Sequence, residues 1–141
     1  MHADVAPLRV LVADDEPHIG RIIKMKLEQG PFVVTLAYDG QEALDALAQD
    51  PDVSLVLLDV MMPYLTGLDV LSRMRADPRW QRLPCIILTA AGQEQHHREA
   101  MALGANEFLT KPFSPKKLYA RAMELLGVTE DHLEEGGAHR S

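Results

Sequence analysis

Five short apolar runs alternate along this chain with five segments whose apolar residues recur at helical spacing. The runs occupy residues 9–13, 32–37, 54–58, 85–88 and 107–110. Runs rich in Val, Ile and Leu, without polar alternation, are typical of strands buried on both faces of a parallel sheet. Strand–helix alternation with short connections predicts right-handed crossovers. The sequence therefore predicts an α/β fold, a (βα)5 doubly wound parallel sheet.

Residues that commonly bound helices support the five intervening segments. Pro17 suits the opening turn of the first helix, and Gly30 suits its end. Asp39 with Glu42 resembles a capping box at the start of the second. The first helix carries apolar residues at helical spacing: Ile19, Ile22, Ile23 and Leu27. Also expected are a third helix carrying Leu68, Leu71 and Met74, a fourth from about Gln93 to Gly104, and a fifth from an N-cap at Ser114 to Gly127.

The chain has 141 residues, a length that suits one domain, expected at 8–127 between an N-terminal segment 1–7 and an acidic, Gly-rich tail 128–141. A net charge of −7 argues against direct nucleic-acid binding, which depends on clustered Lys and Arg. The single cysteine, Cys85, excludes a disulfide framework. Without an apolar stretch long enough to span a bilayer, or a secretory signal, a cytoplasmic protein with no membrane contact is expected.

Two of the apolar runs lead directly into aspartate. Asp14 and Asp15 follow the first run, and Asp59 follows the third. The carboxyl ends of parallel strands share one edge of the sheet, where open α/β sheets bind their ligands. Carboxylates that close repel one another, by about 4 kcal/mol for a pair 4 Å apart at an effective dielectric of 20. The pattern predicts a site that is protonated, solvated or bound to a cation. Taken alone, the Asp14-Asp15 pair also suits an exposed turn or a helix N-cap, with Asp15 or Glu16 as the capping residue before Pro17.

Four motifs follow one another in order, each at the end of a different predicted strand. They are Leu11-Val-Ala-Asp-Asp-Glu-Pro17, Leu57-Leu-Asp-Val-Met-Met-Pro63 with Gly67, Leu88-Thr-Ala90, and Thr110-Lys-Pro-Phe113. Together they make the chain resemble, over about residues 8–127, the receiver domain of two-component response regulators. The resemblance implies a flavodoxin-like sheet with strand order 2-1-3-4-5, which places the first and third strands side by side at the topological switch point.

The resemblance also implies a phosphoryl-transfer site. Asp59 would be the phosphoacceptor, phosphorylated by a sensor histidine kinase or phosphotransfer protein in a reaction that needs Mg²⁺ (or Mn²⁺). Asp15, Asp59 and the backbone carbonyl of Met61 would bind the metal, and Asp14 would act through a water molecule. Mg²⁺ prefers oxygen ligands and keeps several waters, so this small set of protein ligands is chemically reasonable.

Four further residues would respond to the phosphoryl group, according to the same resemblance. Lys111, joined to Pro112 by a cis peptide bond, would contact it, while the Thr89 hydroxyl and the backbone N–H of Ala90 would bind it. Phe108 would be an aromatic switch that changes the surface formed by the fourth helix, fifth strand and fifth helix. Read without the family, Thr89 is an ordinary strand residue and Phe108 an ordinary core residue, and both interpretations stay open.

The expected activity is that of a phosphoacceptor with self-phosphotransfer and self-dephosphorylation, and not that of an enzyme. The competing hypothesis is a metal-dependent phosphohydrolase acting through an aspartyl-phosphate, but such enzymes carry Asp-x-Asp on their first motif strand. The output would be docking to an unidentified downstream protein as a stand-alone receiver, or control of a longer DNA-binding regulator. The oligomeric state would be a monomer or a phosphorylation-dependent homodimer.

Two adjacent histidines, His96 and His97, lie on the predicted fourth helix. Neighbouring helical side chains diverge by about 100°, so the pair cannot share a metal ion. We therefore interpret both as surface residues.

Overall fold

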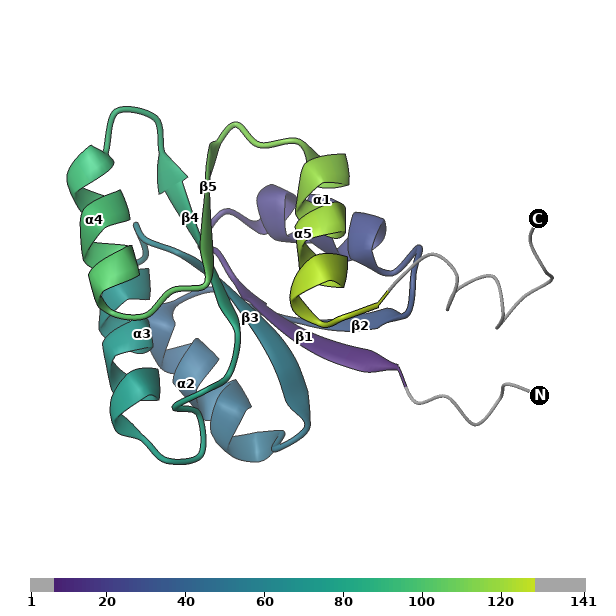
Figure 1. The fold of residues 1–141 in the computed structure, drawn as a ribbon, viewed down its shortest axis with the longest axis horizontal. Helices are drawn as coiled ribbons and strands as arrows, with labels where there is room; N and C mark the ends of the chain where they lie inside the picture. The colour runs from purple at the N-terminus through teal and green to yellow at the C-terminus, as the bar shows by residue number, and fades with distance from the viewer. Residues whose placement is uncertain (1–6, 129–141) are drawn as a thin grey trace, which may run out of the picture.

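A computed structural model describes residues 7–128, so residues 1–6 and most of the predicted tail, 129–141, lie outside the described residues. The described part holds one parallel sheet in the order β2-β1-β3-β4-β5 (Figure 1). The strands are β1 (Leu8–Ala13), β2 (Phe32–Ala37), β3 (Val53–Asp59), β4 (Cys85–Ala90) and β5 (Glu107–Lys111). The predicted doubly wound fold and strand order are confirmed.

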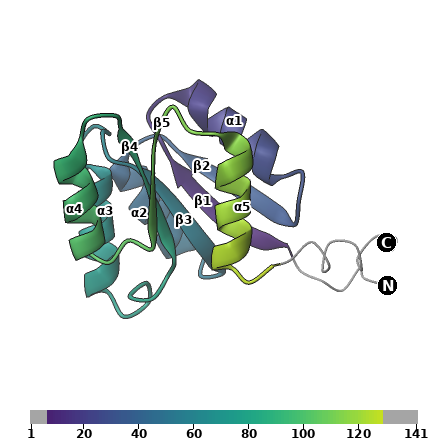
Figure 2. The same cartoon turned by 45° about the horizontal axis from the view of Figure 1, so that its top comes forward.

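Within residues 7–128, five helices cover the two faces of the sheet. They are α1 (Pro17–Leu27), α2 (Gly40–Gln49), α3 (Gly67–Ala76), α4 (Glu94–Ala102) and α5 (Pro115–Leu125). Helices α1 and α5 lie on one face, and α2, α3 and α4 lie on the other, as the turned view also shows (Figure 2). Among the described helices, none is long and apolar enough to cross a membrane.

Strand β1 shows why the apolar runs lack polar alternation. Successive side chains of a strand point to opposite faces. Val10 and Val12 belong to the core beneath α1 and α5, whereas Leu11 and Ala13 belong to the core beneath α2, α3 and α4. Both faces are covered from Val10 to Ala13, so each of these four positions needs an apolar residue.

The predicted helix starts are confirmed at two places. Asp39 accepts a hydrogen bond from the backbone N–H of Glu42 (2.8 Å), and Ser114 accepts one from Lys117 (3.2 Å). The four apolar residues predicted at helical spacing all lie on α1, but they are not equally buried, and Ile22 is 44% exposed. The buried residues of α1 are Gly20, Ile23 and Leu27. Ile22, one position before Ile23, points about 100° away from that narrow stripe.

Parallel pairing brings the carboxyl ends of the strands to the same edge. In the register of β1, β3, β4 and β5, Ala13 pairs with Leu58, Asp59 with Leu88, and Ala90 with Lys111. The predicted site residues therefore meet at this edge, although they lie up to 97 positions apart in the chain.

Candidate functional site

Three carboxylates converge at this edge of the sheet. Asp14, Asp15 and Asp59 each place a carboxylate oxygen within 4.8 Å of the others. Asp14 and Asp59 are almost completely buried, with 1% and 4% of their surface exposed, whereas Asp15 is exposed. Two fixed acids beneath and one acid open to solvent form a negatively charged pocket that a cation can enter.

The ammonium group of Lys111 lies among these acids. Its Nζ donates to Asp14 Oδ2 (2.9 Å) and is 3.3 Å from Asp59 Oδ2. It also donates to Glu16 Oε1 at 3.3 Å. The peptide bond between Lys111 and Pro112 is cis, as expected. Glu16 is a member of the site that sequence reasoning missed, although its position directly after Asp15 was the available signal.

The charges of the pocket do not balance. Burial raises the pKa of Asp59 to about 7, and the neighbouring charge of Asp14 adds to the rise. Lys111 and the backbone of Met61 oppose it. Burial by itself would lower the pKa of Lys111, but its hydrogen bonds and ion pairs with Asp14 and Asp59 outweigh burial, so this pKa is raised. One ammonium group, that of Lys111, lies among four acidic side chains, which leaves the pocket with excess negative charge. The four are Asp14, Asp15, Glu16 and Asp59.

The end of β4 supplies the hydroxyl at the site. Thr89 is buried, 2% exposed, and its Oγ1 donates to the backbone carbonyl of Ala90 (3.1 Å). Phe108, on the neighbouring strand β5, is half-buried against the core that α2, α3 and α4 cover. A cavity of about 380 Å³ is lined by Thr89, Ala90 and Phe108, together with residues of α4.

His97 of α4 belongs to this region as well. It is half-buried, and its ring stacks on Phe108 with centroids 3.5 Å apart and planes inclined by 28°. The interpretation of His97 as a surface residue is therefore wrong. The two residues lie on different elements, so the local sequence carried no signal for their contact.

The loop between β3 and α3 closes the site beside Asp59. Gly67 lies so close to the carbonyl of Asp59 that a Cβ atom there would collide with it. The Gly67 N–H donates to the carbonyl of Val60 (3.0 Å). Glycine thus allows α3 to begin directly behind Asp59. In the same loop, Met61 is 61% exposed and Tyr64 adopts a left-handed backbone conformation with φ of 69°.

Buried acids, a hydroxyl and a lysine at one edge of a sheet ordered 2-1-3-4-5 define a receiver fold. The model of the response regulator receiver domain family matches residues 10–123. The chain therefore belongs to this family, a class of domains in two-component signalling.

Several relatives carry the same domain. The transcriptional regulatory protein SrrA of Staphylococcus aureus is 37% identical over 121 residues, which are 86% of this chain and 48% of that protein. This chain therefore spans about half the length of that relative.

Solved receiver structures are similar over most of the chain. The receiver domain of the Francisella response regulator 1452 has a TM-score of 0.77 and 37% identity, covering 85% of this chain and 97% of that one. The chemotaxis protein CheY4 of Vibrio cholerae has a TM-score of 0.79 and 29% identity, covering 86% and 100%.

Proposed function

We propose that Asp59 accepts a phosphoryl group from the phosphohistidine of a sensor histidine kinase or phosphotransfer protein. An Asp59 oxygen would form a bond to phosphorus while the bond from phosphorus to the donor breaks. The observation that carries this proposal is the position of Asp59 at the end of β3. Its carboxylate is buried beside Asp14, with Lys111 Nζ at 3.3 Å.

The acids of the pocket fit a hard divalent cation. Asp14, Asp15 and Asp59, with the backbone carbonyl of Met61, would hold Mg²⁺ (or Mn²⁺), for which carboxylate and carbonyl oxygens are preferred ligands. A bound Mg²⁺ would supply positive charge facing the incoming phosphoryl oxygens. The exposed position of Asp15 gives the cation a way in from solvent.

Lys111, Thr89 and the backbone N–H of Ala90 would bind the phosphoryl group. Lys111 would exchange a carboxylate partner for a phosphoryl oxygen, and the Thr89 hydroxyl would give up the Ala90 carbonyl, its acceptor at 3.1 Å. When Thr89 turns away, the ring of Phe108 would enter the cavity that both residues line. Phosphorylation would thereby change the surface of α4, β5 and α5.

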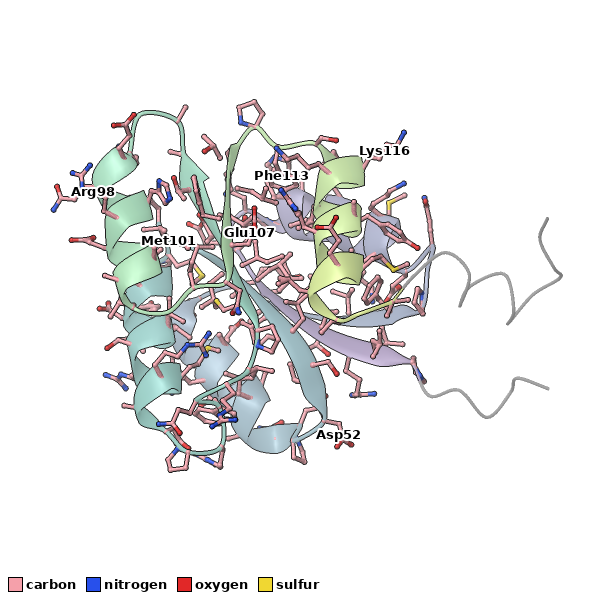
Figure 3. The ribbon with its side chains drawn as sticks, in the orientation of Figure 1. Asp52, Arg98, Met101, Glu107, Phe113 and Lys116 are labelled. Carbon is pink, nitrogen blue, oxygen red and sulfur yellow. The ribbon has the colours of Figure 1, made fainter. Side chains whose placement is uncertain are left out.

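This surface would control a downstream partner. Figure 3 views it with Arg98, Met101, Glu107 and Lys116 labelled on its three elements. The output would be docking as a stand-alone receiver or control of a longer DNA-binding regulator. The similarity to SrrA, a transcriptional regulatory protein, supports the second.

Phosphorylation could also assemble a homodimer through the same surface. Within one chain, Arg121 is 3.5 Å from Glu107 and 2.7 Å from Glu124, so a dimer would have to rearrange these ion pairs. Light scattering with and without beryllofluoride, a phosphoryl analogue, tests this part of the proposal. A monomer under both conditions removes the dimer.

Labelling with radioactive acetyl phosphate and Mg²⁺ tests the phosphoacceptor. We expect a lasting label on one aspartate, lost in Asp59→Asn and retained in Asp52→Asn, an exposed aspartate in the loop before β3. Repeated turnover of organic phosphates without a lasting label would instead support the phosphohydrolase. A label retained in Asp59→Asn would overturn the assignment of the acceptor.

A further inference from the structure

The ring of Phe108 has an aromatic partner outside the phosphoryl site. His97 reaches from α4 and stacks on Phe108 of β5, with ring centroids 3.5 Å apart and planes 28° apart. The pair joins two of the three elements whose surface would change on phosphorylation. Any movement of the Phe108 ring toward the interior must first break this stack.

The space that would receive the ring lies next to the stack. His97, Phe108 and Thr89 all line the cavity of about 380 Å³. In the same arrangement the Thr89 hydroxyl donates to the carbonyl of Ala90. The stacked ring, the empty volume and the orientation of Thr89 therefore belong to one conformation of the protein.

Stacking is well suited to hold this particular residue. Phenylalanine has no hydroxyl, so a hydrogen bond cannot fix the position of its ring, and the contacts of the ring faces must do so. A favourable aromatic pair changes an equilibrium constant by about two- to tenfold beyond the area that it buries. An effect of that size is enough to set the balance between two conformations of similar free energy.

We propose that His97 is a positioning residue that holds the Phe108 ring out of the cavity and so opposes the switch. This inference rests on the proposed function, in which Phe108 moves when Thr89 binds the phosphoryl group. Coupling between two sites is reciprocal. Removing the imidazole should therefore free the ring and tighten the binding of a phosphoryl group at Asp59.

The affinity for beryllofluoride, measured by calorimetry in the presence of Mg²⁺, tests the proposal. We expect His97→Ala to bind it about two- to tenfold more tightly than the unmodified protein. His97→Phe, which keeps a ring able to stack, should bind with the original affinity. His96→Ala is the matched control on the same helix and should change nothing. Unchanged or weaker binding in His97→Ala, or tight binding in His97→Phe, overturns the proposal.

A second comparison shows whether His97 acts through Phe108. In a Phe108→Ala background the stack is absent, so His97→Ala should have no further effect on the affinity. Tightening that persists in this background overturns the proposal.

Failure of this inference can be told apart from failure of the proposed function. If Asp59→Asn binds beryllofluoride as well as the unmodified protein does, the phosphoacceptor assignment fails. If binding depends on Asp59 but ignores His97, only the role of His97 fails.

Discussion

The two ends of the sheet handle charge in opposite ways. At the carboxyl end, Lys111 is the only cation among the described residues that pairs with the acids Asp14, Glu16 and Asp59, and Asp15 lies beside them. At the amino end, the guanidinium of Arg75 is surrounded by neutral acceptors. It donates to the carbonyls of Gly104 (2.9 Å), Trp80 (3.1 Å) and Leu83 (2.9 Å) and to Asn106 Oδ1 (3.3 Å).

The Arg75 cluster also ties the starts of two strands together. Asn106, just before β5, accepts a second hydrogen bond from the backbone N–H of Cys85, the first residue of β4 (2.9 Å). The charge of Arg75 at the amino end is thus fully hydrogen-bonded and has a structural role, whereas the carboxyl end keeps uncompensated negative charge. This fold therefore concentrates its electrostatic cost at the edge where a cation and a phosphoryl group would bind, as functional sites commonly do.

The largest effect on folding stability should come from a substitution at the amino end of the sheet. Arg75→Ala removes the donor from several carbonyl oxygens at once and should lower the free energy of unfolding by about 2–4 kcal/mol. Urea denaturation measures the loss. Arg79→Ala is the control, because Arg79 forms its ion pair only with Asp77 among the described residues and its side chain is 62% exposed. Its loss should stay below about 1 kcal/mol. Equal losses in the two variants would contradict the structural role of the Arg75 hydrogen bonds.

At the carboxyl end, we expect a substitution to stabilise the protein instead of destabilising it. The pKa of Asp59 in the folded protein, about 7, lies above its ordinary value of 3.8, so the folded state binds this proton more tightly than the unfolded state does. The resulting stability is complete below the ordinary pKa and is lost as the pH rises through 7. Without divalent cations, Asp59→Asn should therefore stabilise the protein by about 1–3 kcal/mol above pH 7.

Thermal unfolding in a chelating buffer checks this gain. The gain in stability should shrink steadily toward about pH 4, where residue 59 is neutral in the folded form of both the unmodified protein and the variant. Asp52→Asn, remote from the site, should show no such trend. A destabilised Asp59→Asn protein at pH 8 would mean that the charges at the carboxyl end of the sheet compensate one another.

The affinity for Mg²⁺ should depend on the protonation state of Asp59. Asp59 must lose its proton to bind the metal, so the affinity should fall about tenfold for each pH unit below 7 and level off above it. Calorimetric titration between about pH 5 and pH 8, a range that extends from below to above the Asp59 pKa, would show the slope and the plateau. Asp59→Asn should remove the dependence around pH 7, and a flat profile in the unmodified protein would contradict the assignment.

The smallest effect concerns backbone strain, which is also placed at the carboxyl end. Tyr64, 85% exposed, is the one described residue other than glycine with a positive φ. Tyr64→Gly should stabilise the protein by about 0.5–1 kcal/mol, because glycine adopts this conformation without steric cost. Tyr38→Gly is the control in the neighbouring loop and should be destabilising. The midpoints of denaturant unfolding distinguish the two variants. A loss of stability in both would show that the backbone at Tyr64 is not strained.

Local signals predicted much of the carboxyl end. Asp14, Asp59 and Lys111 follow or end strands that are buried enough to be recognised by composition, and parallel pairing then places their side chains at one edge. The cis bond after Lys111 followed from the family resemblance. The Arg75 cluster had no such signal, because its acceptors are backbone carbonyls of loops that any residue could supply.

The order of the elements and the meeting of three acids with a lysine could be predicted from the sequence, because they depend on local periodicity and on the parallel pairing of strands. The strand order followed from the family resemblance of the motifs. Three features required the folded structure: the pairing of Lys111 with Asp14, the buried face of α1, and the stacking of His97 on Phe108. These depend on the rotation and approach of helices across the sheet, which are set by packing between residues distant in the chain.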